Sequence, residues 1–385
     1  MKRRTFLSSL STLAAAGAGM GLSSPAGAAV PGLTNSRITL GSTLSISGIL
    51  AGRSADVMLG MNAAFGAVNK TGGVNGRELK LMALDDGYAP ARSVENVNRL
   101  LGPDGAFALL SCTGTSNNAA IIPLIEHAGV PYVGPLSGAD SLRLPTSNHV
   151  FHLKAGYADE VNRLIQQLGA MGLQDVGVAY LDNDFGKEIA KRIATRLEAS
   201  KRKAVATAPV SVDGSNAAHT VEQLLAAKPS VVVLATTGSV SATVIRALRT
   251  QSRLLPIAGL SISVAPSDFD ALGSALQGLA LTQVFPDATS PTHGSARAYQ
   301  AAMRASGHDQ FNSNSFEGYI NAMVLAEGIR RAGRDATRDS LRAALAGMNK
   351  YDVGEFELSF GNDTPYVGSH FVGMGVLGAS GRFIG

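Results

Sequence analysis

Two short polar loops hold residue types that suit the binding of a small anion. One loop, residues 111–118, lies between an apolar stretch at 107–110 and a segment of helical spacing at 119–127. The other, residues 134–140, follows the apolar stretch 130–133. Hydroxyl groups and free backbone N–H groups at the start of a helix favour a negatively charged group such as a carboxylate.

The elements around these loops should bring them together. Strand, loop, helix and strand in this order form a βαβ unit, and in an open parallel sheet the loops at the carboxyl ends of the strands share one edge, where ligands bind. The alternative is that Thr115, Ser116 and Asn117 only cap the following helix, which these residue types do well. One such loop favours capping, whereas two successive polar loops favour a small-molecule site.

Residues that suit metal binding or nucleophilic chemistry have ordinary structural explanations elsewhere in the chain. Cys112 is the single cysteine, and a small buried thiol at a strand end is the expected role. Asp182 and Asp184 precede a predicted helix and are expected to be turn or cap residues. The histidines lack the spacing of metal ligands, so no metal and no cofactor are predicted.

The first 29 residues have the features of an export signal peptide. Lys2, Arg3 and Arg4 precede a small apolar stretch, and residues 25–29 offer a small-residue cleavage site. The paired arginines followed by Thr-Phe-Leu resemble a twin-arginine signal, and an ordinary secretory signal is the alternative. We therefore expect a soluble periplasmic protein. No later run of about 18 apolar residues would span a membrane.

The charge balance and the cysteine content argue against further classes of protein. Of 33 basic residues three belong to the signal, which leaves 30 against 29 acidic residues and a net charge of +1. This balance gives no reason to expect nucleic-acid binding. A single cysteine excludes an internal disulfide, and no cysteine at the cleavage site offers a lipid anchor. We expect a monomer without a direct membrane anchor.

From residue 37 the chain alternates strand and helix patterns, which is typical of an α/β fold. About 355 residues are more than one core usually holds, so two domains are expected. Strands are predicted at 38–44, 79–84, 107–110, 130–133, 175–180, 204–212, 230–235, 256–260 and 279–284. Helices are predicted at 55–69, 91–101, 119–127, 160–171, 187–200, 217–227, 241–251, 267–276, 295–304, 316–332 and 339–348. The alternating, Gly-rich segments 356–360, 370–377 and 382–384 indicate a short antiparallel addition.

At this point the chain resembles a known family, the type I periplasmic solute-binding proteins of the branched-chain amino acid (Leu/Ile/Val-binding) group, which serve ABC importers. The resemblance runs from about residue 37 to the C terminus. It is carried by SGILAGRSADVMLGMNAAFGAVNKTGGVNGRELKLMALDDGY (47–88), IPLIEHAGVPYVGPLSGA (122–139), YLDNDFGKE (180–188), QVFPD (283–287) and SFEGYINAMVLAEGIRRAG (315–333).

The resemblance implies two Rossmann-like lobes, each a parallel sheet flanked by helices, with three hinge crossings between them and the ligand in the cleft. Lobe one would comprise residues 37–152 and 285–352. Lobe two would comprise residues 153–284 and 353–385.

The resemblance also implies which residues bind the ligand. In the family, lobe one holds the ligand carboxylate with the loop that matches residues 113–117 and with the next loop, which matches 136–138. Lobe two supplies an aromatic residue in the loop of Phe185, a residue after a strand where this chain has Thr237, and often an acidic residue where it has Ser261. The implied ligand-binding residues are Thr113, Thr115, Ser116, Asn117, Ser137, Gly138, Tyr157 near the hinge, Phe185, Thr237 and Ser261.

The expected function is capture of a small solute and its delivery to the membrane permease of an ABC transporter, with no reaction. A ligand-sensing subunit of a membrane receptor is an alternative that the same fold would support. An exported α/β enzyme is the second alternative. Against the enzyme, the mature chain has no G-x-S-x-G, no P-loop and no G-x-G-x-x-G after a strand.

The ligand class depends on Ser261. A buried ammonium group is costly without a charged or strongly accepting partner, and no acidic residue follows Ser261 until Asp268. Unless Glu160, Asp182 or Asp184 reaches the cleft, the sequence favours a keto acid, an aromatic acid or an amide over an amino acid. Aromatic side chains at 157 and 185 would supply apolar walls.

Overall fold

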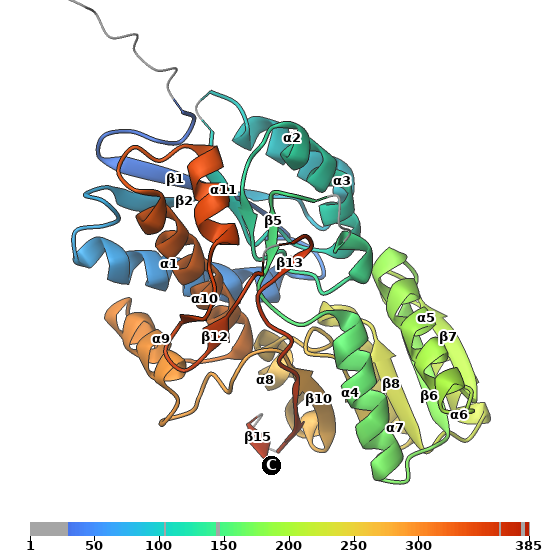
Figure 1. Cartoon of the computed structure of the whole chain (residues 1–385). Coiled ribbons are helices and arrows are strands. Elements are labelled where there is room, and N and C mark those ends of the chain that lie inside the picture. Colours follow the sequence, from blue (N-terminus) through green and yellow to red (C-terminus); the bar gives the residue numbers. More distant parts are fainter. Residues whose placement is uncertain (1–29, 104, 144–146, 362, 379–381, 385) are drawn as a thin grey trace, which may run out of the picture.

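The computed structural model describes residues 30–103, 105–143, 147–361, 363–378 and 382–384, and the expected signal at 1–29 lies outside the described residues. Two large sheets organise the chain (Figure 1). The first has the order β13-β5-β4-β3-β1-β2, and all its pairs are parallel. Its strands are β1 (Arg37–Leu44), β2 (Glu78–Asp85), β3 (Ala108–Leu110), β4 (Tyr132–Val133), β5 (Val150–His152) and β13 (Tyr366–Val367).

The second sheet has the order β15-β14-β10-β9-β8-β6-β7. Its strands are β6 (Val176–Leu181), β7 (Ala206–Val210), β8 (Val231–Ala235), β9 (Ile257–Gly259), β10 (Leu279–Gln283), β14 (Gly373–Leu377) and β15 (Phe383–Ile384). β14 pairs antiparallel with β10 and with β15, which confirms the short antiparallel addition. A separate antiparallel pair is formed by β11 (Tyr351–Asp352) and β12 (Glu357–Leu358).

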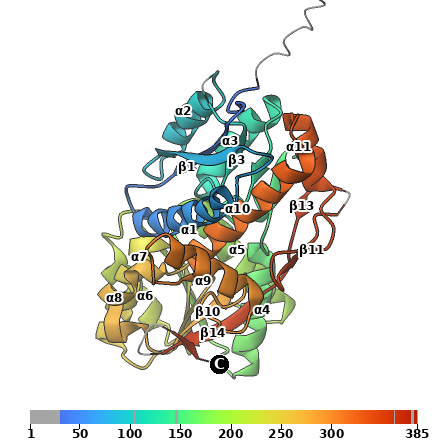
Figure 2. The same cartoon turned by 90° about the vertical axis from the view of Figure 1, so that its left-hand side faces the viewer.

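Helices cover both faces of the first sheet because its strands are apolar on both faces. On β3, Leu110 packs in the cluster that contains α1 and α10, whereas the adjacent Leu109 packs with α2 and α3. α1 and α10 lie side by side (Figure 2). The helices of this half are α1 (Ala51–Lys70), α2 (Pro90–Leu100), α3 (Thr115–His127), α9 (Gly294–Ala305), α10 (Ser313–Ala332) and α11 (Arg338–Ala346).

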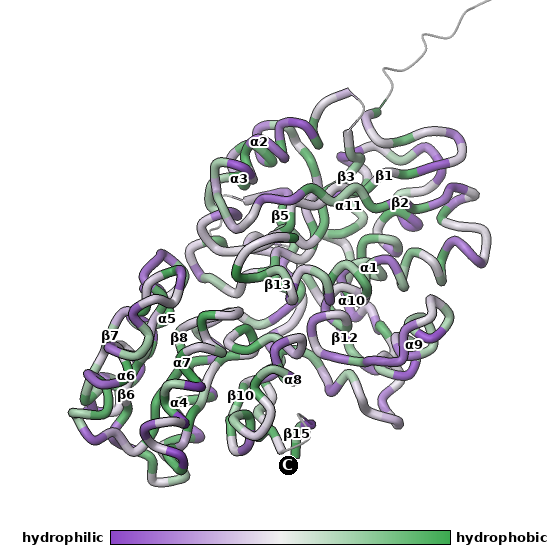
Figure 3. Tube along the Cα trace, turned by 180° about the vertical axis from the view of Figure 1, so that it is seen from behind, coloured by the Kyte–Doolittle hydropathy of each residue, from purple (hydrophilic) through white to green (hydrophobic). Residues whose placement is uncertain are grey.

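The second half follows the same plan. Its helices are α4 (Tyr157–Ala170), α5 (Asp184–Ala199), α6 (Ala217–Ala226), α7 (Gly238–Gln251) and α8 (Phe269–Leu272). Hydrophilic and hydrophobic segments alternate along α5 and α6 (Figure 3), as expected for amphipathic helices. The helix expected at 267–276 is broken into α8 and the 3-10 turns Pro266–Asp268 and Gly273–Leu276.

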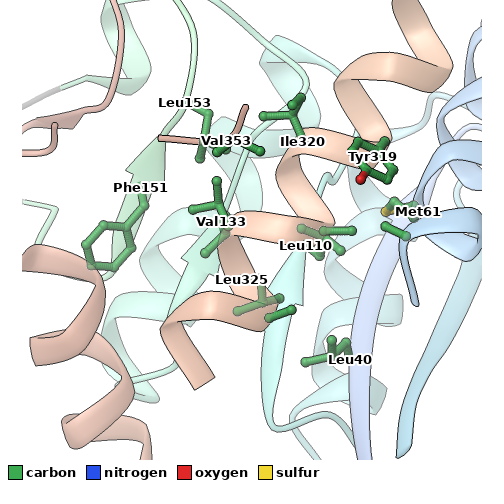
Figure 4. Close-up of a cluster of buried hydrophobic side chains, with 14 of the residues drawn as sticks. Leu40, Met61, Leu110, Val133, Phe151, Leu153, Tyr319, Ile320, Leu325 and Val353 are labelled. Carbon is green, nitrogen blue, oxygen red and sulfur yellow. The ribbon is translucent and has the colours of Figure 1, made fainter. Parts of the chain in front are cut away.

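Each half has its own apolar core. In the first, Leu40 from β1 and Leu110 from β3 meet Met61 of α1 and Leu325 of α10 (Figure 4). In the second, the fully buried valines of β8 pack with α4, α5 and α7. The α/β fold predicted from the sequence is therefore confirmed.

The chain passes between the halves three times, after β5, after β10 and after β13. The third passage differs from the expected boundary at 352/353. Val353, Phe356 and Phe360 pack in the core of the first half, and Tyr366 on β13 stacks on Phe151 of β5 at 4.8 Å. Residues 353–361 and 363–367 therefore belong with the first sheet, because their apolar side chains are buried there.

Candidate functional site

The loops at the carboxyl ends of the strands of one sheet contact those of the other. Ser116, which follows β3, donates a hydrogen bond to Asp184 Oδ2 at 3.2 Å. Asn183 Nδ2 donates to the Tyr88 hydroxyl at 3.4 Å. The N–H of Ser239 donates to the Ile49 carbonyl at 3.2 Å. The two halves are therefore closed on each other at the edge where a ligand would bind.

The two polar loops of the first half meet as predicted. Thr113 forms a parallel bridge with Leu136, and the hydroxyls of Thr115 and Ser137 lie 2.9 Å apart. Residue Gly114 is the N-cap of α3, and no side chain caps this helix. The side chains of Thr115, Ser116 and Asn117 therefore do not cap α3. The hydroxyls of Thr115 and Ser116 instead contact Ser137 and Asp184.

Asn117 belongs to a buried network that the sequence analysis did not identify. Its Nδ2 donates to Ser93 Oγ at 2.7 Å, and Ser93 donates to Asp86 Oδ2 at 2.9 Å. The Asp86 carboxylate also accepts hydrogen bonds from Thr43, Ser45 and the N–H of Tyr88. The network fixes the amide plane of Asn117 and leaves its buried Oδ1 without a hydrogen-bond partner in the chain.

Tyr157 links the two halves at the start of α4. Its N–H donates to the Gly138 carbonyl at 2.7 Å, and a Cβ on Gly138 would come within 2.7 Å of its ring. Its ring packs edge-on against Phe185, with centroids 5.6 Å apart. Burial raises the pKa of Tyr157. Its buried hydroxyl has no hydrogen-bond partner in the chain.

The remaining predicted residues of the second half lie on neighbouring loops. Thr237 is buried, and its hydroxyl donates to the Ile262 carbonyl at 2.8 Å. The N–H of Ser261 donates to Glu160 Oε2 at 2.9 Å, and the hydroxyl of Thr282 donates to the same oxygen. A carboxylate on α4 therefore lies beside Ser261, and it belongs to one of the three acidic residues that the sequence analysis named as possible exceptions.

A buried charge cluster lies beside the first passage between the halves. Glu317 of α10 pairs with Arg53 of α1 at 2.5 Å and with Lys154 at 2.6 Å, and all three side chains are at most 5% exposed. Burial by itself would raise the pKa of Glu317, but the charges of Lys154 and Arg53 hold it below its usual value. Sequence analysis missed this cluster because its members lie in three separate segments of the chain.

Residues that the sequence analysis considered for metal binding or nucleophilic chemistry have structural roles. Asp182 pairs with Lys187 at 2.8 Å, and the N-cap of α5 is Asn183 between the two aspartates. Burial raises the pKa of Cys112 to about 12, which is the property of an inert thiol. Within the part of the chain that the structure describes, no group of three or more His, Cys, Asp or Glu side chains is placed to hold a metal ion. None of the described helices is long and apolar enough to cross a bilayer.

Comparison with known proteins gives consistent matches. A family model described as periplasmic binding protein matches residues 37–366. A substrate-binding periplasmic protein from Ralstonia solanacearum is 32% identical, with a TM-score of 0.84 over 90% of this chain and 99% of that one. An extracellular ligand-binding receptor from Verminephrobacter eiseniae is 25% identical, with a TM-score of 0.84 over 91% of this chain and 100% of that one.

An amino acid binding protein from Pseudomonas aeruginosa is 28% identical over 110 residues, which cover 24% of this chain and only 29% of that relative. The family model and the Ralstonia solanacearum structure each cover most of the chain. The chain therefore belongs to the periplasmic binding protein family and has its type I fold.

Proposed function

We propose that this protein captures a small carboxylate-bearing solute, or an amide, between two lobes and delivers it to the permease of an ABC transporter. The observation that carries the proposal is the convergence of polar loops from both sheets on one closed edge. Three side chains there have a buried polar atom that lacks a partner in the chain, namely Asn117 Oδ1, Tyr157 OH and Glu160 Oε1. Buried polar groups are rarely left unpaired, so a bound solute is the natural partner.

Lobe one supplies the carboxylate site in this proposal, through Thr113, Thr115 and Ser137. Phe185 and Thr237 of lobe two contact the solute from the opposite side. Tyr157 lies at the bottom of the cleft, next to the hinge. The three passages after β5, β10 and β13 act as the hinge. Capture then needs only opening and closure of the lobes, and no bond of the solute is made or broken.

A ligand screen tests this function. Thermal shift of the purified protein against amino acids, keto acids, aromatic acids and amides should identify a ligand, which at 100 times its Kd stabilises the fold by about 2.7 kcal/mol. Small-angle scattering with that ligand should then show compaction if the protein is open without it. An unchanged radius of gyration at saturating ligand would contradict closure of the lobes, and no stabilisation by any compound would contradict solute capture.

The role of Thr115 gives a separate prediction. Its hydroxyl lies 2.9 Å from Ser137 and does not cap α3. Replacing Thr115 with Val should weaken binding of the screened ligand by about 1–3 kcal/mol, the scale of a hydrogen bond to a charged group. Thr250→Val is the matched control, because that exposed hydroxyl on α7 contacts only its own helix. Calorimetric titration measures the affinity of both variants for the ligand. Equal affinities would show that Thr115 does not contact the ligand.

A further inference from the structure

The loops that precede the strands of the second sheet hold an excess of basic residues. These loops, together called the basic end of the second sheet, are residues 171–175, 200–205, 227–230, 252–256 and 277–278. Their charged residues are the basic Lys201, Arg202, Lys203, Lys228 and Arg253 and the acidic Asp175, a balance of +4. Residues 30–385 have 30 basic and 29 acidic residues, a balance of only +1, so positive charge is concentrated at this end.

The other end of the same sheet has the opposite charge. The loops that follow β6 to β10 contain three aspartates and no lysine or arginine, and they are residues 182–183, 211–216, 236–237, 260–265 and 284–293. This end contacts the first half, for example through Asn183. The basic end lies about 20 Å away, the length of a six-residue strand such as β6, and points away from the first sheet (Figure 1).

The loops of the basic end lie side by side. β7, β6, β8 and β9 are adjacent parallel strands, so their amino ends span three strand spacings, roughly 14 Å. The N–H of Ser230 donates to the Asp175 carbonyl at 2.8 Å, which holds two of the loops together. Within the described part of the chain, none of the five basic side chains forms an ion pair. Four of them are exposed and Arg202 is partly buried, so their charges are open to a partner outside the chain.

An apolar surface lies within the basic end. Leu254 directly follows Arg253 and is 91% exposed, and Met171 in the loop before β6 is 57% exposed. A cavity of about 1320 Å³ lies beside both, and its lining also includes Leu255 and Val376. Cations around an exposed leucine and an apolar cavity form an amphipathic surface, which suits a partner that is both negatively charged and apolar.

An anionic phospholipid bilayer has both properties. Its negatively charged head groups attract Lys and Arg, and an apolar side chain inserts at the boundary between head groups and acyl chains. A nucleic acid is also a polyanion, but proteins hold single strands by stacking bases on aromatic side chains, and the five loops contain no Phe, Tyr or Trp. The exposure of Leu254 among basic residues therefore favours a lipid surface.

We propose that the basic end of the second sheet docks on the surface of an anionic phospholipid bilayer, with Leu254 inserted among the lipids. The docking is reversible and needs no covalent anchor. It leaves the loops at the other end of the strands, where the two halves meet, free for a solute. The inference goes beyond solute capture and does not depend on it.

Vesicle sedimentation tests the proposal on the purified protein without the expected signal, residues 30–385. The protein should bind vesicles of phosphatidylglycerol mixed with phosphatidylcholine and should not bind vesicles of phosphatidylcholine alone. Binding should fall as the salt concentration rises from about 0.1 M to about 1 M, because the Debye length shrinks from about 10 Å to about 3 Å. Equal binding to the two kinds of vesicle would overturn the proposal.

The triple variant Lys201→Gln/Arg202→Gln/Lys203→Gln should lower the partition coefficient on phosphatidylglycerol vesicles roughly 100-fold, because each basic residue near an anionic surface contributes about fivefold. Its melting temperature should stay near the wild-type value. If these residues only complement the C terminus of α5, the variant will melt at a lower temperature and bind the vesicles like the wild type, which would overturn the proposal.

Lys70→Gln/Arg99→Gln/Lys350→Gln is the matched control. It removes the same three charges from exposed positions of the first half. Lys350 also matches Lys201 in backbone conformation, with φ of +50° and +56°. The control should bind phosphatidylglycerol vesicles within about threefold of the wild type, because these charges lie more than a Debye length from the docked surface. Equal weakening in the two triple variants would show an effect of net charge alone and overturn the proposal.

Leu254→Ser tests the lipid partner separately from the charge. It should lower the partition coefficient about tenfold, the scale of removing one buried apolar side chain, and leave the salt dependence unaltered. An unchanged partition coefficient would overturn insertion into lipid and assign the basic end to a soluble polyanion. None of these measurements uses a solute, so a negative result leaves solute capture between the lobes intact.

Discussion

Replacing Glu317 with Gln should lower the free energy of unfolding by about 3–5 kcal/mol, because it leaves Arg53 and Lys154 buried without a counterion. Both cations are at most 5% exposed, and both depend on the same carboxylate. Gln keeps the size of the side chain and removes only its charge, so loss of packing contributes little. Urea unfolding monitored by circular dichroism measures the effect.

Glu327→Gln on the same helix is the matched control. Glu327 pairs with Arg330 and Arg331, whose side chains are 63% and 37% exposed, so solvent screens these pairs and rehydrates the arginines when the charge is lost. We expect a loss of at most about 1 kcal/mol. Equal losses in the two variants would show that the Glu317 cluster is no more stabilising than an ion pair whose arginines are exposed to solvent.

The Glu317 carboxylate should also make the stability of the protein depend on pH. Because the pKa of Glu317 is lowered in the folded protein, the unfolded chain binds its proton more readily. The contribution of Glu317 to stability is therefore fully present above its unfolded pKa of about 4.3 and is lost as the pH falls through the folded value. The difference in stability between wild type and Glu317→Gln should shrink steadily below about pH 4.3.

Replacing Gly238 with Ala should weaken ligand binding by about 1–3 kcal/mol, the usual scale of overpacking, by obstructing closure of the two halves. Gly238 follows β8 of the second sheet, and an added Cβ would lie 2.1 Å from the Ile49 carbonyl of the first half. This carbonyl also accepts the hydrogen bond from Ser239. The closed arrangement cannot form around the methyl group without a shift of one loop, whereas an open arrangement is free of this contact.

Gly273→Ala separates closure from backbone strain. Gly273 also has a positive φ, +51° against +60° for Gly238, but no atom lies within 4 Å of its added Cβ. Both variants place a side chain at a positive φ and should lose stability from backbone strain, about 1–3 kcal/mol. Only Gly238→Ala should bind the screened ligand more weakly and show a larger radius of gyration in its presence. Unaltered affinity in Gly238→Ala would mean that the contact with Ile49 does not control closure.

Local sequence patterns determined the α/β architecture and the main polar loops. Helix and strand periodicity depends on residues a few positions apart, so β1, α1 and the unit from β3 to β4 were predictable without knowledge of their neighbours. The meeting of Thr115 with Ser137 followed from one general rule, that loops after parallel strands share an edge. Export is likewise a sequence-based expectation, carried by residues 1–29 alone.

Only the tertiary structure decided which distant side chains meet. Arg53 and Glu317 are 264 positions apart, Lys154 and Glu317 are 163 apart, and Glu160 and Ser261 are 101 apart. No local pattern marks such pairs, because each member is compatible with an exposed helix or loop position. These charges are paired because an unpaired charge is costly to bury. Tyr366 lies on the first sheet because its ring packs against Phe151 there. The carboxylate that lies beside Ser261 therefore comes from a helix and not from the loop of Ser261 itself.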